Sequence, residues 1–101
     1  MGEHATQCVG EFLGTLILIL LGNSVVANVS LSRTKGHGSG WLVITTGWGL
    51  AVYSAVLCVE EISGAHLNPA VTIGLAMAGK FPWTSTAGFI ASQMLGGIAG
   101  G

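Results

Sequence analysis

The residues best suited to chemistry are the three in the run Asn68-Pro69-Ala70. Asn68 is a good helix N-cap, and Pro69 suits the first position of a helix. As a cap, the side-chain oxygen of Asn68 would accept a backbone N–H, which leaves its NH₂ group, with two donors, free for a ligand. The helix dipole would add partial positive charge at the same point. This arrangement would hold water or a hydroxyl group and disfavour cations, although capping alone is the other interpretation of Asn68.

The residues directly before Asn68 add hydrogen-bond acceptors. We expect Ser63–Leu67 to be extended, and the carbonyl groups of Gly64, Ala65 and His66 cannot all pair within so short a segment. Gly64 and Ala65 are small and leave space beside the backbone. The imidazole of His66 either lines this space or packs as an ordinary buried side chain.

Glu11 is a carboxyl group inside an apolar stretch, where a charge costs about 2.5–3.5 kcal/mol on insertion scales. It shares a helical face with Gly14, Thr15, Leu18 and Gly22. That face is small and polar, so we expect Glu11 to point into a helix bundle. The alternative is a residue near a helix end that reaches the membrane interface.

Other classes of protein are excluded by composition. Only 7% of residues are charged, half are hydrophobic and the mean hydropathy is +0.74, which argues against a soluble enzyme and against disorder. Three Lys/Arg against four Asp/Glu give no basic surface for nucleic acid. The sequence has no HExxH motif, its three histidines lack metal-ligand spacing, and Cys8 and Cys58 read as reduced packing residues. We expect no enzyme, no metal and no cofactor.

Three stretches are long enough to span a bilayer, which takes about 20 apolar residues: 8–29, 41–59 and 83–101. A polar loop with Arg33 and Lys35 separates the first two. Gly96, Gly97, Gly100 and Gly101 form two small-xxx-small pairs, and Gly10 with Gly14 forms another, which predicts close helix contacts.

A fourth helix is predicted over 69–79, where Gly79 is a plausible stop. Its length of about 16 Å is roughly half of a hydrocarbon core of about 30 Å. It is too short to cross a membrane and too apolar to lie in water, so residues 63–79 read as a re-entrant loop and half-helix. Irregular backbone at membrane depth requires protein around it or a water-filled cavity, and the sequence therefore predicts a cavity.

The run Ser63-Gly64-Ala65-His66-Leu67-Asn68-Pro69-Ala70-Val71-Thr72 closely resembles the first signature loop of the aquaporin (major intrinsic protein) family. The resemblance covers nearly the whole chain, with Gln93 and the glycines after it similar to the family's third span. It implies an all-α membrane protein, with residues 1–101 as the first inverted repeat: three transmembrane helices plus one re-entrant half-helix. The second NPA motif and the filter arginine of the family are missing from this sequence, so we expect a fragment or a half that needs its complement.

The resemblance also assigns roles. Asn68, Pro69 and Ala70 would form the pore constriction with Gly64, Ala65 and His66, and Glu11 would hold the loop. Trp48 matches the family's selectivity filter, where glycerol facilitators commonly carry Trp, and its indole would be an apolar wall for a polyol. Val52 would continue the pore wall on the same face. The alternative for Trp48 is an interfacial tryptophan, although Trp41 and Trp83, at span starts, fit that belt better.

The partners implied are the lipid bilayer, glycerol and water, the second half of the channel and a homotetramer. The resemblance places the chain in the cell (plasma or inner) membrane as a multi-pass protein with a cytoplasmic amino terminus. A count of cations gives the opposite orientation, because it places the loop with Arg33 and Lys35 inside. We follow the resemblance, since three cations are a small sample.

The leading functional hypothesis is half of a passive channel for glycerol, other small neutral solutes and water. One alternative is a water-selective aquaporin. Another is a non-conducting membrane fragment that only packs with a partner.

Overall fold

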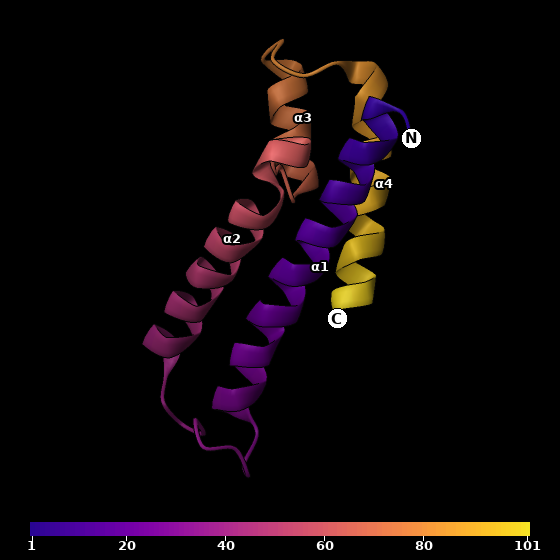
Figure 1. The fold of residues 1–101 in the computed structure, drawn as a ribbon. Helices are drawn as coiled ribbons and strands as arrows, with labels where there is room; N and C mark the ends of the chain where they lie inside the picture. The colour runs from indigo at the N-terminus through magenta and orange to yellow at the C-terminus, as the bar shows by residue number, and fades with distance from the viewer.

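The computed structural model describes residues 1–101, which form four helices and no strand. These are α1 (Glu3–Ser30), α2 (Trp41–Ser63), α3 (Pro69–Met77) and α4 (Trp83–Gly100) (Figure 1). No disulfide joins them, since Cys8 and Cys58 are both free.

Local features set where each helix ends, and the ends of α1 and α2 differ from the expected ranges. α2 runs on through Glu60 and Glu61 to Ser63, and it stops where Gly64 adopts a left-handed φ of 85° and donates its N–H to the carbonyl of Glu60. α3 stops as expected near Gly79: the Gly79 N–H bonds the Ala76 carbonyl and the Lys80 N–H bonds that of Leu75, which forms a Schellman motif. α1 begins at Glu3, an acidic residue in a first turn, where it complements the helix dipole.

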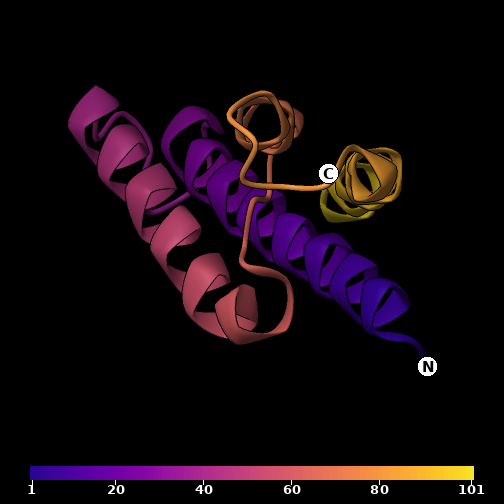
Figure 2. The same cartoon turned by 90° about the horizontal axis from the view of Figure 1, so that it is seen from above.

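α1 is the central helix, with α2 on one side and α4 on the other (Figure 2). The predicted glycine contact exists for Gly96 and Gly100. A Cβ atom there would lie 2.3 Å from the carbonyl oxygen of Phe12 and 2.5 Å from that of Leu16, respectively. The backbones of α1 and α4 therefore touch directly. The second predicted pair, Gly97 with Gly101, makes no such contact, because the nearest atom to a Cβ at Gly97 is a side-chain carbon 4.0 Å away.

α3 packs against α4, near the end of the molecule where α2 finishes and α1 starts (Figure 1). Its nine residues span about 14 Å, less than half of a hydrocarbon core. The chain reaches α3 by reversing direction after α2, through the short segment 64–68.

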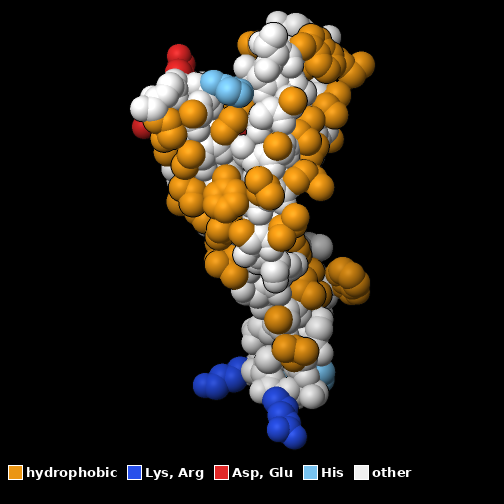
Figure 3. Space-filling view, turned by 90° about the vertical axis from the view of Figure 1, so that its right-hand side faces the viewer, with side chains coloured by type: hydrophobic (Ala, Val, Ile, Leu, Met, Phe, Trp, Pro, Cys, Tyr) orange, Lys and Arg blue, Asp and Glu red, His pale blue; other side chains and the backbone are white.

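Polar side chains lie inside the molecule and large apolar side chains lie outside. Six of the buried side chains are polar or charged: Glu11, Thr15, Ser63, Thr72, Thr86 and Gln93. Leucine, valine, isoleucine and methionine are exposed on all four helices, and Figure 3 shows them along most of the length of one face. Because α1 and α2 are also long and apolar enough to cross a membrane, this distribution is the one expected for a chain surrounded by lipid.

Candidate functional site

The loop between α2 and α3 is not extended as predicted. Gly64, Ala65 and Leu67 have left-handed φ values of 85°, 53° and 59°, and Asn68 returns to extended backbone. In an extended strand, successive N–H groups point to opposite sides. The left-handed turns instead aim the N–H groups of His66 and Leu67 at the same side chain, which is why the expectation was wrong. Such φ values cost about 1–3 kcal/mol each for non-glycine residues and need support from their surroundings.

Glu11 supplies that support. Its side chain is 0% exposed and its carboxylate accepts four hydrogen bonds. One oxygen accepts from the Ser63 hydroxyl at 2.6 Å and the His66 N–H at 3.2 Å. The other accepts from the Leu67 N–H at 2.8 Å and the Gln93 side-chain NH₂ at 2.7 Å. The carboxylate thus joins α1, the end of α2, the loop and α4.

A second set of hydrogen bonds ties α3 to the same network. The NH₂ group of Gln93 also donates to the Thr72 hydroxyl at 2.9 Å, and that hydroxyl pairs with Nδ1 of His66 at 2.9 Å. Thr72 and Gln93 are buried. The Gln93 side-chain oxygen has no partner, but turning the amide around would place that oxygen against the carboxylate of Glu11. The orientation of Gln93 is therefore fixed by Glu11.

The imidazole of His66 packs against two phenylalanine rings. Its ring centre lies 4.7 Å from that of Phe81 and 4.9 Å from that of Phe89. Phe89 is fully buried. These contacts and the hydrogen bond to Thr72 fix the direction of the imidazole.

Asn68 caps α3 in the way the sequence predicts. Its side-chain oxygen accepts the Ala70 N–H at 2.8 Å, and Pro69 occupies the first helical position. No protein acceptor pairs with the NH₂ group of Asn68, and the residue is exposed. The carbonyl groups of Gly64, Ala65, His66 and Leu67 likewise accept no hydrogen bond from the protein.

These groups can bind a neutral hydroxylic molecule. Asn68 offers two N–H donors and the loop offers carbonyl acceptors. The one charged group nearby, the carboxylate of Glu11, is buried and fully used by the protein. The start of α3 adds the positive end of a helix dipole. The groups that the site leaves free for a ligand are therefore polar and uncharged.

Trp48 and Val52 lie on α2, and no hydrogen bond or ring contact joins them to the loop. The half-buried indole of Trp48 covers Gly22 of α1, where a Cβ atom would lie 2.2 Å from the ring. Val52 is 44% exposed. The structure thus brings Glu11 against the backbone of His66 and places Asn68, Pro69 and Ala70 directly after the loop. Trp48 and Val52 make no such contact with this loop.

Sequence reasoning missed Thr72, Phe81, Phe89 and Gln93 as parts of the site, and it included Ser63 only as the start of the loop that Glu11 holds. Thr72 had a signal, because it lies one turn after Asn68 on the same face of α3. Gln93 also had one, since an amide inside an apolar helix needs a polar partner. The phenylalanines had none. Phe81 lies in the loop before α4 and Phe89 lies on α4, so their contacts with His66 depend on how these segments pack. No group of three metal-ligating side chains is present.

The comparisons with known proteins agree with this architecture. The family model described as Major intrinsic protein matches residues 2–101. A probable glycerol uptake facilitator protein of Thermotoga maritima is 64% identical over 90 residues, which is 89% of this chain and 38% of that protein. Glycerol uptake facilitator protein 3 of Lactiplantibacillus plantarum is 54% identical over 97 residues, which is 96% of this chain and 40% of that protein.

A solved structure gives the same result. The X-ray structure of the aquaglyceroporin from Plasmodium falciparum matches with a TM-score of 0.85 and 37% identity, over 96% of this chain and 39% of that one. The chain belongs to the major intrinsic protein family, whose members are passive membrane channels and not enzymes. It is similar to glycerol uptake facilitators and corresponds to the N-terminal part of these relatives, about two fifths of their length. The predicted family and the predicted all-α fold are confirmed, and the chain is a multi-pass membrane protein.

Proposed function

We propose that this segment forms one half of a passive channel for glycerol and other small neutral solutes, and for water. The observation that carries the proposal is the uncharged set of donors and acceptors around Asn68. Several relatives are named glycerol uptake facilitators, which supports the choice of glycerol.

In this proposal, the loop forms the pore constriction. The NH₂ group of Asn68 donates to one hydroxyl group of the solute. The carbonyl groups of Gly64, Ala65 and His66 accept hydrogen bonds from its other hydroxyl groups. Pro69 and Ala70 complete the helix start: proline carries no N–H, and the N–H of Ala70 is held by Asn68. The helix dipole disfavours cations at this point. Glu11 acts only through the shape of the loop.

Trp48 is the selectivity filter in this proposal, and Val52 continues the wall. The indole gives the carbon backbone of a polyol an apolar surface that water does not need. The support from the structure is the fixed position of Trp48 against Gly22.

The proposal includes a second half. Val71, Ile73 and Met77 on α3 are exposed, and the relatives are much longer than this segment. The complementary half would cover α3 and close the pore. A homotetramer in the plasma or inner membrane, with a cytoplasmic amino terminus, completes the proposal.

Solute uptake by proteoliposomes tests this function. We expect the intact protein to speed the uptake of glycerol well beyond that of empty liposomes, while glycerol phosphate and sodium remain excluded. Faster water uptake, with glycerol uptake no faster than in empty liposomes, would favour the water-selective alternative. A well-inserted protein that passes neither solute would leave the non-conducting fragment as the better description.

A further inference from the structure

The Thr72 hydroxyl has three polar neighbours. The side chain is fully buried near the start of α3. Its oxygen lies 2.9 Å from the Gln93 NH₂ group, 2.9 Å from Nδ1 of His66 and 3.4 Å from the Asn68 carbonyl. A hydroxyl donates one hydrogen bond and accepts two at most. Thr72 therefore cannot donate to both His66 and Asn68.

The bond from Gln93 has a fixed direction. The carboxylate of Glu11 accepts one hydrogen of the Gln93 NH₂ group at 2.7 Å, which sets the orientation of the amide. The same NH₂ group donates to the Thr72 hydroxyl, so Thr72 is the acceptor of that bond. The hydrogen of the hydroxyl itself is then left for either His66 or Asn68.

Distance and competition direct this hydrogen to His66. A hydroxyl usually lies about 2.5–3.0 Å from the oxygen to which it donates. The Asn68 carbonyl is 3.4 Å away, and it already accepts the backbone N–H of Thr72 at 3.2 Å. Nδ1 of His66 is closer, at 2.9 Å. The Thr72 hydroxyl therefore donates to Nδ1, which must carry a lone pair and no hydrogen.

A neutral imidazole with a lone pair on Nδ1 carries its hydrogen on Nε2. No protein group forms a hydrogen bond with Nε2 of His66. The ring is half-buried, and Nε2 lies 4.0 Å from where a Cβ atom would stand on the exposed Gly64. Contacts with the rings of Phe81 and Phe89 hold the imidazole in place. The Nε2–H group is therefore an unused donor beside the loop.

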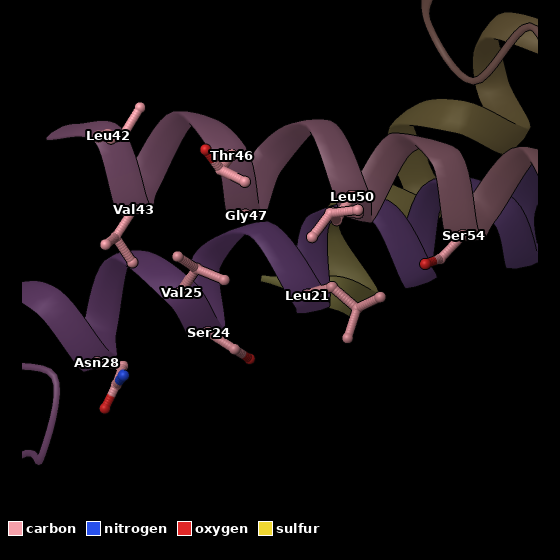
Figure 4. A pocket seen from close by; sticks show the side chains of 11 residues that line it. Leu21, Ser24, Val25, Asn28, Leu42, Val43, Thr46, Gly47, Leu50 and Ser54 are labelled. Carbon is pink, nitrogen blue, oxygen red and sulfur yellow. The ribbon is translucent and has the colours of Figure 1, made fainter.

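This donor is separate from the groove between α1 and α2. Figure 4 shows the side chains along that groove. They include neither His66 nor Thr72, nor any other residue of the loop 63–70. A molecule that accepts a hydrogen bond from Nε2 would therefore meet it at the loop.

We propose that Thr72 is a positioning residue that fixes His66 in the neutral form with hydrogen on Nε2, which gives the loop a second donor besides Asn68. This inference rests on the proposed function, in which the loop lines the pore. A hydroxyl group of the solute then accepts from His66 while others donate to the loop carbonyl groups. With its hydrogen on Nδ1, the ring would instead add one more acceptor to the carbonyl groups that the loop already offers.

Nitrogen NMR of the intact protein in lipid bilayers, with isotope-labelled histidine, tests the assignment without any measurement of transport. Spectra are recorded at alkaline pH, where imidazole side chains are neutral. The His66 ring is identified by its contacts with Phe81 and Phe89. We expect hydrogen on Nε2, none on Nδ1, and the Thr72 hydroxyl hydrogen next to Nδ1. Hydrogen on Nδ1 in the wild type would overturn the proposal.

Replacing Thr72 tests its part in this assignment. Thr72→Val removes the hydroxyl, and we expect the ratio of the Nε2–H form to the Nδ1–H form to fall by about fivefold, the effect of one ordinary hydrogen bond. Thr72→Ser keeps a hydroxyl and should keep the wild-type ratio. Thr86→Val is the matched control, because Thr86 is also buried but its hydroxyl donates to the Pro82 carbonyl. An unchanged ratio in Thr72→Val would refute the role of Thr72.

Glycerol uptake by proteoliposomes tests the donor. We expect Thr72→Val to slow uptake by about fivefold per inserted protein, and Thr72→Ser to match the wild type. A changed ratio with unchanged uptake would overturn the donor role of His66. If the wild type passes no glycerol, the proposed function fails, and the NMR spectra still decide the role of Thr72. If Thr72→Val does not fold, the hydrogen found next to Nδ1 in the wild type decides it.

Discussion

The carboxylate of Glu11 receives four hydrogen bonds inside a helix that is otherwise apolar, and two of them come from backbone N–H groups of the loop. It thereby stabilises left-handed backbone at Ala65 and Leu67, which such residues rarely adopt. The loop is thus shaped by a buried residue whose carboxylate bonds only protein groups.

Replacing Glu11 tests this role. In Glu11→Gln, an NH₂ group replaces one of the two carboxylate oxygens, each of which accepts two hydrogen bonds. Two buried donors therefore lose their acceptor. We expect a loss of stability of about 1–3 kcal/mol and a lower glycerol rate. Thermal unfolding in detergent measures the first effect. Glu3→Gln, an exposed carboxyl on the same helix, is the control and should be nearly neutral. Unchanged stability in Glu11→Gln would contradict the assignment.

Trp48 is tested by substrate preference. Phenylalanine gives a smaller apolar wall, so Trp48→Phe should lower glycerol permeability relative to water by about tenfold, the low end of what one change in an apolar pocket produces. Stopped-flow light scattering measures both rates. Trp41→Phe, at the exposed start of α2, should behave like the wild type. If both permeabilities of Trp48→Phe were unchanged, Trp48 would have no filter role.

The helices pack through close contact of α4 with α1, and this contact positions Gln93 against Glu11. A Cβ at Gly96 would meet the carbonyl oxygen of Phe12 at 2.3 Å, which is backbone and cannot move aside. Gly96→Ala should therefore cost about 1–3 kcal/mol through overpacking. Gly97→Ala has open space and should be neutral or slightly stabilising. Thermal unfolding compares the two, and equal midpoints would show that the close contact is unimportant.

The helices were predictable because apolar runs, Asn68, Pro69 and Gly79 mark them locally. The left-handed turns at Ala65 and Leu67 were not, because neither residue type signals such backbone. The capping of α3 by Asn68 was also predictable from neighbouring residues. The partners of Glu11 lie between 52 and 82 residues away in sequence, so they depend on how the helices pack.

For the molecule as a whole, the proposed function requires a longer channel to which this segment belongs, and the relatives are indeed longer than this segment. We expect the protein in its native membrane to have an intact mass of about 25–28 kDa, from a segment of 10.2 kDa that covers about two fifths of its relatives. Mass spectrometry of the purified protein measures this. A mass near 10.2 kDa would mean that a separate chain must complete the pore.

In the proposed channel, the free NH₂ group of Asn68 serves the solute, beyond its role as a cap. Asn68→Asp keeps an oxygen for the Ala70 N–H but has no NH₂ donors, whereas Asn68→Ala loses both. We predict that both variants lower glycerol flux in proteoliposomes, while only Asn68→Ala loses about 1 kcal/mol of stability. Wild-type glycerol flux through a well-inserted Asn68→Asp channel would contradict the claim and leave Asn68 as a helix cap alone.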